Sequence, residues 1–142
     1  MSTINKDTQI IMNGSNMTVL PTNFPDVEIL YINDCKFLTA IPTLSSLREL
    51  YCSGDVSITK IAHQPKLLKL VCKGCTAITM LPQFPSITHL DCRKCTNLFQ
   101  LPPLPSGVEL INDPHTQLHH TNSFTIAPSP KKIAPMPELF PK

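Results

Sequence analysis

Apolar residues recur with a period of twenty along most of the chain. The most regular column holds only leucine, at Leu30, Leu50, Leu70, Leu90 and Leu110. Seven columns keep this register over four periods, which is the sequence pattern of a protein built from stacked structural repeats. A single unit of this kind cannot cover its own apolar face, so neighbouring units bury it between them. The period therefore predicts a solenoid.

The residues around each column leucine alternate as they do in a half-buried strand. In one unit, Leu70 and Cys72 should point into the solenoid while Lys69 and Val71 point outward, because side chains alternate along a strand. The same inward position two residues after the leucine is filled by Ile32, Cys52, Cys72, Cys92 and Asn112. We therefore predict a parallel sheet of about five short strands.

Each unit reads L-x-x-L-x-C-x-x-C, followed by a half that contains proline. The first half is visible in LLKLVCKGC and ITHLDCRKC, and the second in ITMLPQFP and LFQLPPLP. These motifs resemble the leucine-rich repeat family, in particular the short repeats of bacterial effectors and of giant DNA viruses. The resemblance covers roughly residues 17–113. It implies an N-terminal capping segment at 1–24, a leucine-rich repeat solenoid at 25–113 and a proline-rich extended tail at 114–142.

Two Cys-x-x-Cys pairs raise the question of a metal site. Cys72 with Cys75, and Cys92 with Cys95, are separated by sixteen residues, a spacing typical of four-cysteine zinc sites. The repeat explains the same spacing without metal, because equivalent cysteines lie one period apart and the second column also accepts Asp55. Buried cysteine acts as a small apolar side chain. We expect a structural thiol ladder and no cofactor, with zinc binding by these four cysteines as the alternative.

Proline is unusually frequent and glycine rare, at 15 and 4 residues of 142. This density of helix breakers excludes long helices, and Pro42, Pro82 and Pro102 suit an irregular, extended convex side of the solenoid. No apolar stretch is long enough to span a bilayer, and the N-terminus lacks the regions of a secretion signal. We expect an intracellular protein, in the cytoplasm or in a virion, with reduced cysteines.

Sequence signatures of enzymes are missing. The chain has no Gly-rich phosphate loop, no Gly-x-Ser-x-Gly elbow and no His-Glu-x-x-His motif. His89 lies near Cys92 in the sequence, but the two side chains are expected to point in opposite directions. The formal charge of +2 does not call for a nucleic-acid partner. We therefore expect a protein that is not an enzyme and whose partner is another protein.

Outward positions on the predicted strands are the candidate binding residues, as the resemblance to leucine-rich repeat proteins implies. Tyr31 and Tyr51 would be neighbours on adjacent strands, either as an anchor for a partner or as a pair that only stabilises the sheet. Positive charge gathers in the middle repeats, as a solvated face or as a surface for an acidic partner. The candidate contact residues are Tyr31, Tyr51, Lys69, Lys73 and Arg93.

The proline-rich tail carries spaced apolar residues, at Phe124, Ile126, Ile133, Leu139 and Phe140. This composition favours an extended, polyproline-like path that does not fold alone. Two functional hypotheses result. A protein–protein interaction module would bind its partner through the strand face. A structural component, such as a minor capsid or cement protein of a large DNA virus, would instead use the tail to bind between larger subunits.

Overall fold

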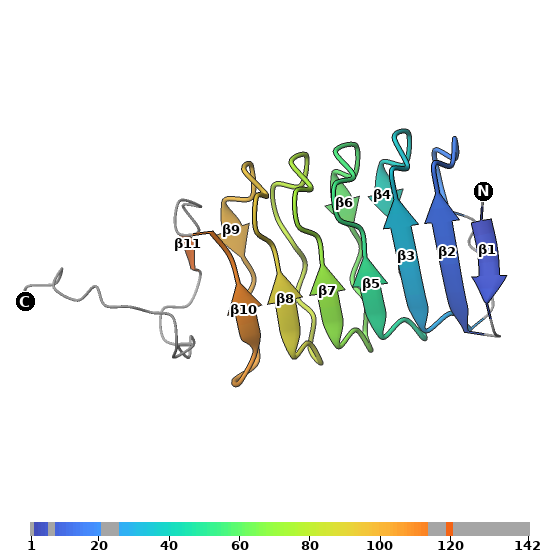
Figure 1. The fold of residues 1–142 in the computed structure, drawn as a ribbon. Coiled ribbons are helices and arrows are strands. Elements are labelled where there is room, and N and C mark those ends of the chain that lie inside the picture. The colour runs from blue at the N-terminus through green and yellow to red at the C-terminus, as the bar shows by residue number, and fades with distance from the viewer. Residues whose placement is uncertain (1, 6–7, 21–25, 114–118, 121–142) are drawn as a thin grey trace, which may run out of the picture.

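The computed structural model of the chain describes residues 2–5, 8–20, 26–113 and 119–120. They form a solenoid with one seven-stranded sheet, in the order β1-β2-β3-β5-β7-β8-β10 (Figure 1). These strands are β1 (Ser2–Asn5), β2 (Gln9–Asn13), β3 (Ile29–Asn33), β5 (Glu49–Tyr51), β7 (Lys69–Val71), β8 (His89–Asp91) and β10 (Glu109–Ile111). All neighbours pair in parallel except β1 and β2, which are antiparallel. The predicted solenoid of short parallel strands is confirmed.

The strands pair without slippage, one period apart. Leu50 pairs with Leu30 on one side and with Leu70 on the other, and this register continues to Leu90 and Leu110. A shift of one residue would turn every inward side chain to the solvent, so the leucine column specifies the register. The strand register predicted from the leucine column is therefore the register observed.

One parallel strand more than the sequence predicted lies at the N-terminal end. Within the segment expected to be only a cap, β2 pairs with β3 so that Ile10 lies beside Leu30 and Met12 beside Ile32. Both side chains are fully buried. The repeat was hidden here because neither residue is the leucine or cysteine that identifies the column elsewhere.

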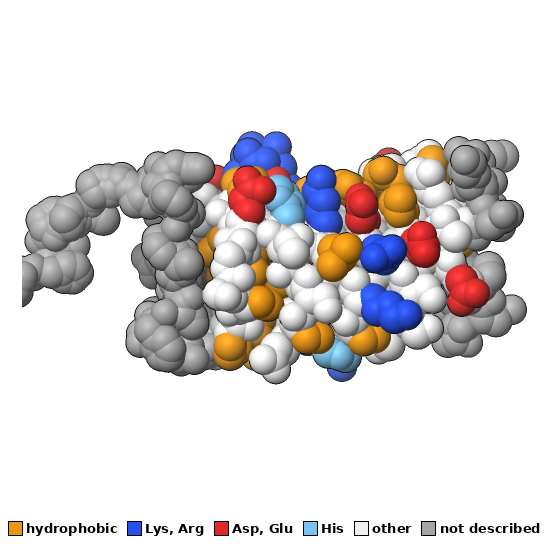
Figure 2. Space-filling view, turned by 90° about the horizontal axis from the view of Figure 1, so that it is seen from below, with side chains coloured by type: hydrophobic (Ala, Val, Ile, Leu, Met, Phe, Trp, Pro, Cys, Tyr) orange, Lys and Arg blue, Asp and Glu red, His pale blue; other side chains and the backbone are white. Residues whose placement is uncertain are grey.

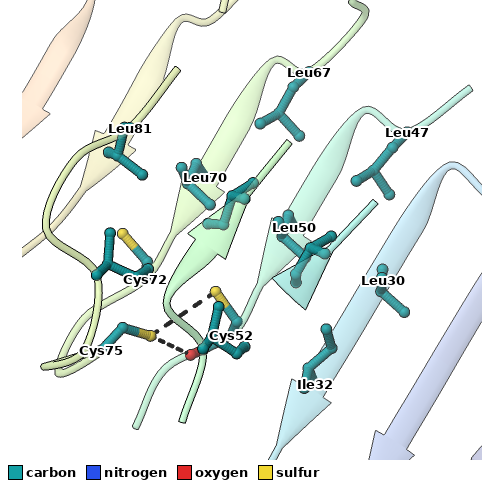
Figure 3. Packing of buried hydrophobic residues seen from close by; sticks show 14 of the residues in the cluster. Leu30, Ile32, Leu47, Leu50, Cys52, Leu67, Leu70, Cys72, Cys75 and Leu81 are labelled. Atoms are coloured by element: carbon teal, nitrogen blue, oxygen red, sulfur yellow. Dashed lines mark hydrogen bonds between the residues drawn. The ribbon is translucent and has the colours of Figure 1, made fainter. Parts of the chain in front are cut away.

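The core is a set of stacked columns between the sheet and the opposite side of the solenoid. Leu30, Leu50, Leu70 and Leu90 are completely buried, as are all six cysteines. Figure 3 shows Leu30, Leu50 and Leu70 on neighbouring strands. Burying one leucine side chain contributes about 2 kcal/mol. Lys69 and Val71 flank buried Leu70 and are only half-buried, which confirms the predicted alternation.

A second periodic feature appears where the chain leaves each strand. Positions 14, 34, 54, 74 and 94 all have positive φ angles, between 56° and 80°. Glycine adopts this left-handed conformation without strain at Gly54 and Gly74, whereas Asp34 and Lys94 adopt it at a cost of about 1 kcal/mol each. The turn is therefore a part of the repeat that the apolar columns do not reveal.

The opposite side of the solenoid carries short strands. They are β4 (Ala40–Ile41), β6 (Lys60–Ile61), β9 (Gln100–Leu101) and β11 (His119–His120). β4 pairs with β6 and β9 with β11, and Met80 bridges to Gln100. Among the described residues there is no helix long and apolar enough to cross a membrane. The predicted tail residues Phe124, Ile126, Ile133, Leu139 and Phe140 lie outside the described residues.

Candidate functional site

The strand face, meaning the outward side chains at positions 29, 31 and 33 and at the equivalent positions of each later repeat, holds a stacked aromatic pair. Rings of Tyr31 and Tyr51 are parallel within 9°, with centroids 4.6 Å apart. The register of β3 and β5 places them directly opposite each other. Lys69 on the next strand brings its Nζ to 5.4 Å from the Tyr51 ring centroid, a cation–π contact. Three of the predicted contact residues therefore form one cluster.

The Tyr51 hydroxyl is held in place. It donates a hydrogen bond of 2.6 Å to Oε2 of Glu49, two residues earlier on the same strand. Burial, and then the nearby Glu49 carboxylate, raise the pKa of Tyr51, so its hydroxyl stays protonated. The hydrogen bond and the stacking on Tyr31 therefore hold the Tyr51 ring in one orientation.

Arg93 is engaged within the chain. Its Nη2 lies 2.6 Å from Oδ2 of Asp91 and its Nε lies 2.9 Å from Oδ1, a two-pronged ion pair. Burial raises the pKa of Asp91, but the Arg93 bonds outweigh it and the net pKa is lowered. Asp91 pairs with Val71 in the register of β7 and β8, yet only 5% of its surface is exposed. Arg93 and Asp91 therefore neutralise each other on the strand face.

Lys69 and Lys73 differ from Arg93 in this respect. In the part of the chain that the structure describes, neither lysine has an acidic partner. Lys73 is exposed in the turn that follows β7. Both ammonium groups are consequently available to an external anion.

His89 and Cys92 do not form a catalytic pair. His89 lies half-buried on the strand face with Nδ1 2.8 Å from Oε2 of Glu109. Cys92 is completely buried, and burial raises the pKa of its thiol to about 12. A neutral, inaccessible thiol is a poor nucleophile.

Two of the cysteines predicted as zinc ligands, Cys75 and Cys95, donate their thiols to backbone carbonyls one turn earlier. Cys75 Sγ donates to the Cys52 carbonyl at 2.7 Å and lies 4.0 Å from the Cys52 sulfur (Figure 3). Cys95 Sγ donates to the Cys72 carbonyl at 2.9 Å. The pKa of Cys72 is raised by its contact with Cys95 and by burial, while the same contact lowers the pKa of Cys95. All these sulfurs lie in the core.

No three potential ligands come together to hold a metal ion in the residues that the structure describes. Cys72 and Cys92, and likewise Cys75 and Cys95, occupy equivalent positions in successive turns. Zinc binding through all four would require thiols to leave carbonyl partners in the core. The geometry favours the structural ladder, and zinc stays an untested alternative.

A groove beside the strand face was missed by the sequence reasoning. It lies at the edge where the parallel strands begin and has a volume of about 370 Å³. Its lining residues are Glu28, Ser46, Arg48, Lys66, Leu68 and Ser86. Figure 2 views the solenoid from this end and shows basic and acidic side chains close together on it. The sequence signal for this groove is the column of Glu28, Arg48 and Leu68, which lies one residue before the first outward position of each strand.

Comparisons with known proteins add no assignment. No family model, curated protein or solved structure matches the chain. Membership of the leucine-rich repeat family therefore stays a prediction from the sequence repeat.

Proposed function

We propose that the chain is a non-catalytic protein–protein interaction module of the leucine-rich repeat type. The observation that supports this most strongly is the cluster of Tyr31, Tyr51 and Lys69 on the strand face. Tyrosines contribute large contact areas at low entropic cost, and here stacking and the Glu49 bond have already fixed one of them. A rigid sheet that presents a fixed aromatic anchor is well suited to binding a protein.

The cluster also has a purely structural explanation, because stacked aromatic pairs stabilise sheets. Replacing Tyr51 by Leu separates the two. Leucine keeps apolar cover over the sheet but removes the hydroxyl, the stacking and the cation–π contact. We expect Tyr51→Leu to fold normally and to lose the partner that copurifies with the natural chain from its native source. Val71→Leu, at the next position in the same column, is the matched control and should retain the partner.

A structural role through the tail is the second candidate, favoured by the spaced apolar residues among the prolines of 121–142. As a minor capsid or cement protein, the chain would associate with its assembly through Phe124, Ile126, Ile133, Leu139 and Phe140. Truncation after residue 120 would then abolish association, and Tyr51→Leu would leave it intact. The reverse result supports the interaction module.

A further inference from the structure

The charges on the strand face are unequally satisfied. Four acidic side chains lie on it. Asp91 is neutralised by its ion pair with Arg93, and Glu109 contacts His89. Glu49 and Asp113 accept from uncharged donors, the Tyr51 hydroxyl and the Lys94 backbone amide, and keep their charge. Lys69 and Lys73, by contrast, have no acidic partner within residues 2–5, 8–20, 26–113 and 119–120. The face as a whole is therefore mixed in charge, and its unpaired cations lie together on β7 and in the turn that follows it.

The groove adds two further cations and one carboxylate, Glu28, at the edge of the sheet. Arg48 and Lys66 both line it, and both are exposed without an acidic partner among the described residues. Leu68 adds an apolar surface to the lining, and Ser46 and Ser86 add hydroxyl groups. Lys66 and Lys69 lie in the same turn on either side of Leu68, which joins the groove to the Tyr51 cluster. The result is a cationic strip made of Arg48, Lys66, Lys69 and Lys73.

We propose that the cationic strip binds an acidic, extended segment of a partner protein, with its carboxylates on Arg48, Lys66 and Lys69 and an apolar side chain against Leu68. This inference rests on the proposed interaction function and names the chemistry of the partner. Arginine and lysine on a partly apolar surface bind carboxylates while their stems pack against aliphatic groups. Charge complementarity of this kind governs both the rate and the specificity of association.

A nucleic acid fits the same surface less well. Its phosphates repeat every few ångströms, so a strand that crosses the groove would also meet Glu28, which has no basic partner in the described part of the chain. Neighbouring strands are only about 4.8 Å apart, which keeps Glu28 close to Arg48. An acidic peptide can place an uncharged residue at that point. The surface also lacks the aromatic residues interleaved with basic ones that stack bases.

The test is fluorescence anisotropy with three labelled probes: a Glu-rich peptide of about twelve residues that includes one leucine, a Lys-rich peptide of equal length, and a thymidine oligonucleotide of about twelve nucleotides. We expect binding of the Glu-rich peptide alone, weakened about tenfold between about 50 mM and about 300 mM salt. Preferential binding of the oligonucleotide, or no binding of the Glu-rich peptide, overturns the proposal.

Variants locate the binding site. Lys66→Glu and Lys69→Glu should each weaken binding of the Glu-rich peptide about tenfold, and Lys66→Gln about threefold. Lys60→Glu is the control, since Lys60 lies exposed on β6, on the opposite side of the solenoid. The affinity of the Lys60→Glu variant for the Glu-rich peptide should stay within about twofold of that of the natural chain. Equal losses of peptide affinity in Lys60→Glu and Lys66→Glu would show that the peptide does not bind at the cationic strip. If the peptide fails to bind while Tyr51→Leu still loses the native partner, only the acidic chemistry is wrong.

Discussion

At the scale of single residues, Asp55 is a buried carboxyl group in a column that otherwise holds cysteine in the neighbouring repeats. It occupies the column of Cys35, Cys75 and Cys95, and 2% of its surface is exposed. Its Oδ1 accepts a 2.7 Å hydrogen bond from the Cys35 amide, whereas its buried Oδ2 has no partner. Burial raises the pKa of Asp55 from 3.8 to about 6, outweighing the Cys35 bond that lowers it.

This carboxyl group makes stability depend on pH. Between pH 3.8 and about 6 the folded state holds a proton that the unfolded state has released, so the free energy of unfolding falls as pH rises through this window. The loss is about 3 kcal/mol. Asp55→Asn removes the ionisation but keeps an acceptor for Cys35. We expect urea denaturation to show that this variant is more stable than the natural chain at neutral pH.

The control is Asp26→Asn, the same change at an exposed aspartate. It should retain the pH dependence of the natural chain, while Asp55→Asn should lose most of it between pH 4 and pH 7. An equally steep decline in Asp55→Asn would mean that Asp55 is ionised in the folded protein throughout this range.

At the scale of the element, the repeat predicted where the strands lie. It did not predict what polar residues do where they replace apolar ones in the repeat. Leucine and cysteine columns place β3, β5, β7, β8 and β10, because burial and register follow directly from periodic apolar residues. The same columns missed β2, where Ile10 and Met12 replace the consensus. Gln64 lies one period from both Leu44 and Phe84, but the apolar pattern does not reveal what an amide does in the core. That role depends on backbone groups that the columns do not report.

Gln64 illustrates the difference. Its side chain is fully buried, accepts from the Leu44 amide at 2.9 Å, and donates to the carbonyls of Pro42 and Ala62 at 2.7 and 3.0 Å. Gln64→Leu restores the apolar column but leaves these three backbone groups without their partner. We expect a loss of about 2–4 kcal/mol in the free energy of unfolding, measured by urea denaturation.

Phe84→Leu, in the same column, is the comparison for Gln64→Leu. It removes apolar volume without orphaning a polar group, so its cost should be smaller, about 1–2 kcal/mol. A Gln64→Leu variant as stable as the natural chain would show that the amide is not needed to satisfy the backbone at this position.

At the scale of the whole molecule, all six free cysteines lie in the interior of the solenoid, whereas the strand face carries most of the candidate contact residues. The candidate face could be predicted in part: Tyr31, Tyr51 and Lys69 do come together, because residues one period apart lie side by side. The Arg93–Asp91 pair and the groove could not, since both depend on side-chain conformation. Register predicts proximity, and it does not predict which charges neutralise each other.

The interior makes a prediction about metal and thiol reactivity. Because all six cysteines are buried, a thiol reagent should modify the folded chain only as fast as it unfolds, and six thiols should react promptly in denaturant. Protein purified without chelator should contain far less than one zinc per chain and should keep its stability when a chelator is added. About one zinc per chain, with unfolding by chelator, would establish the four-cysteine site instead.

The central claim is that the strand face, and not the tail, holds the partner. Lysine crosslinking with mass spectrometry in the native source tests it most directly, because lysines lie in both regions. We predict that Lys66, Lys69 and Lys73 become linked to one partner protein, preferentially through its acidic segments. Links to a major structural protein from Lys131, Lys132 and Lys142, with none from the strand face, would contradict the account and identify the chain as an assembly component.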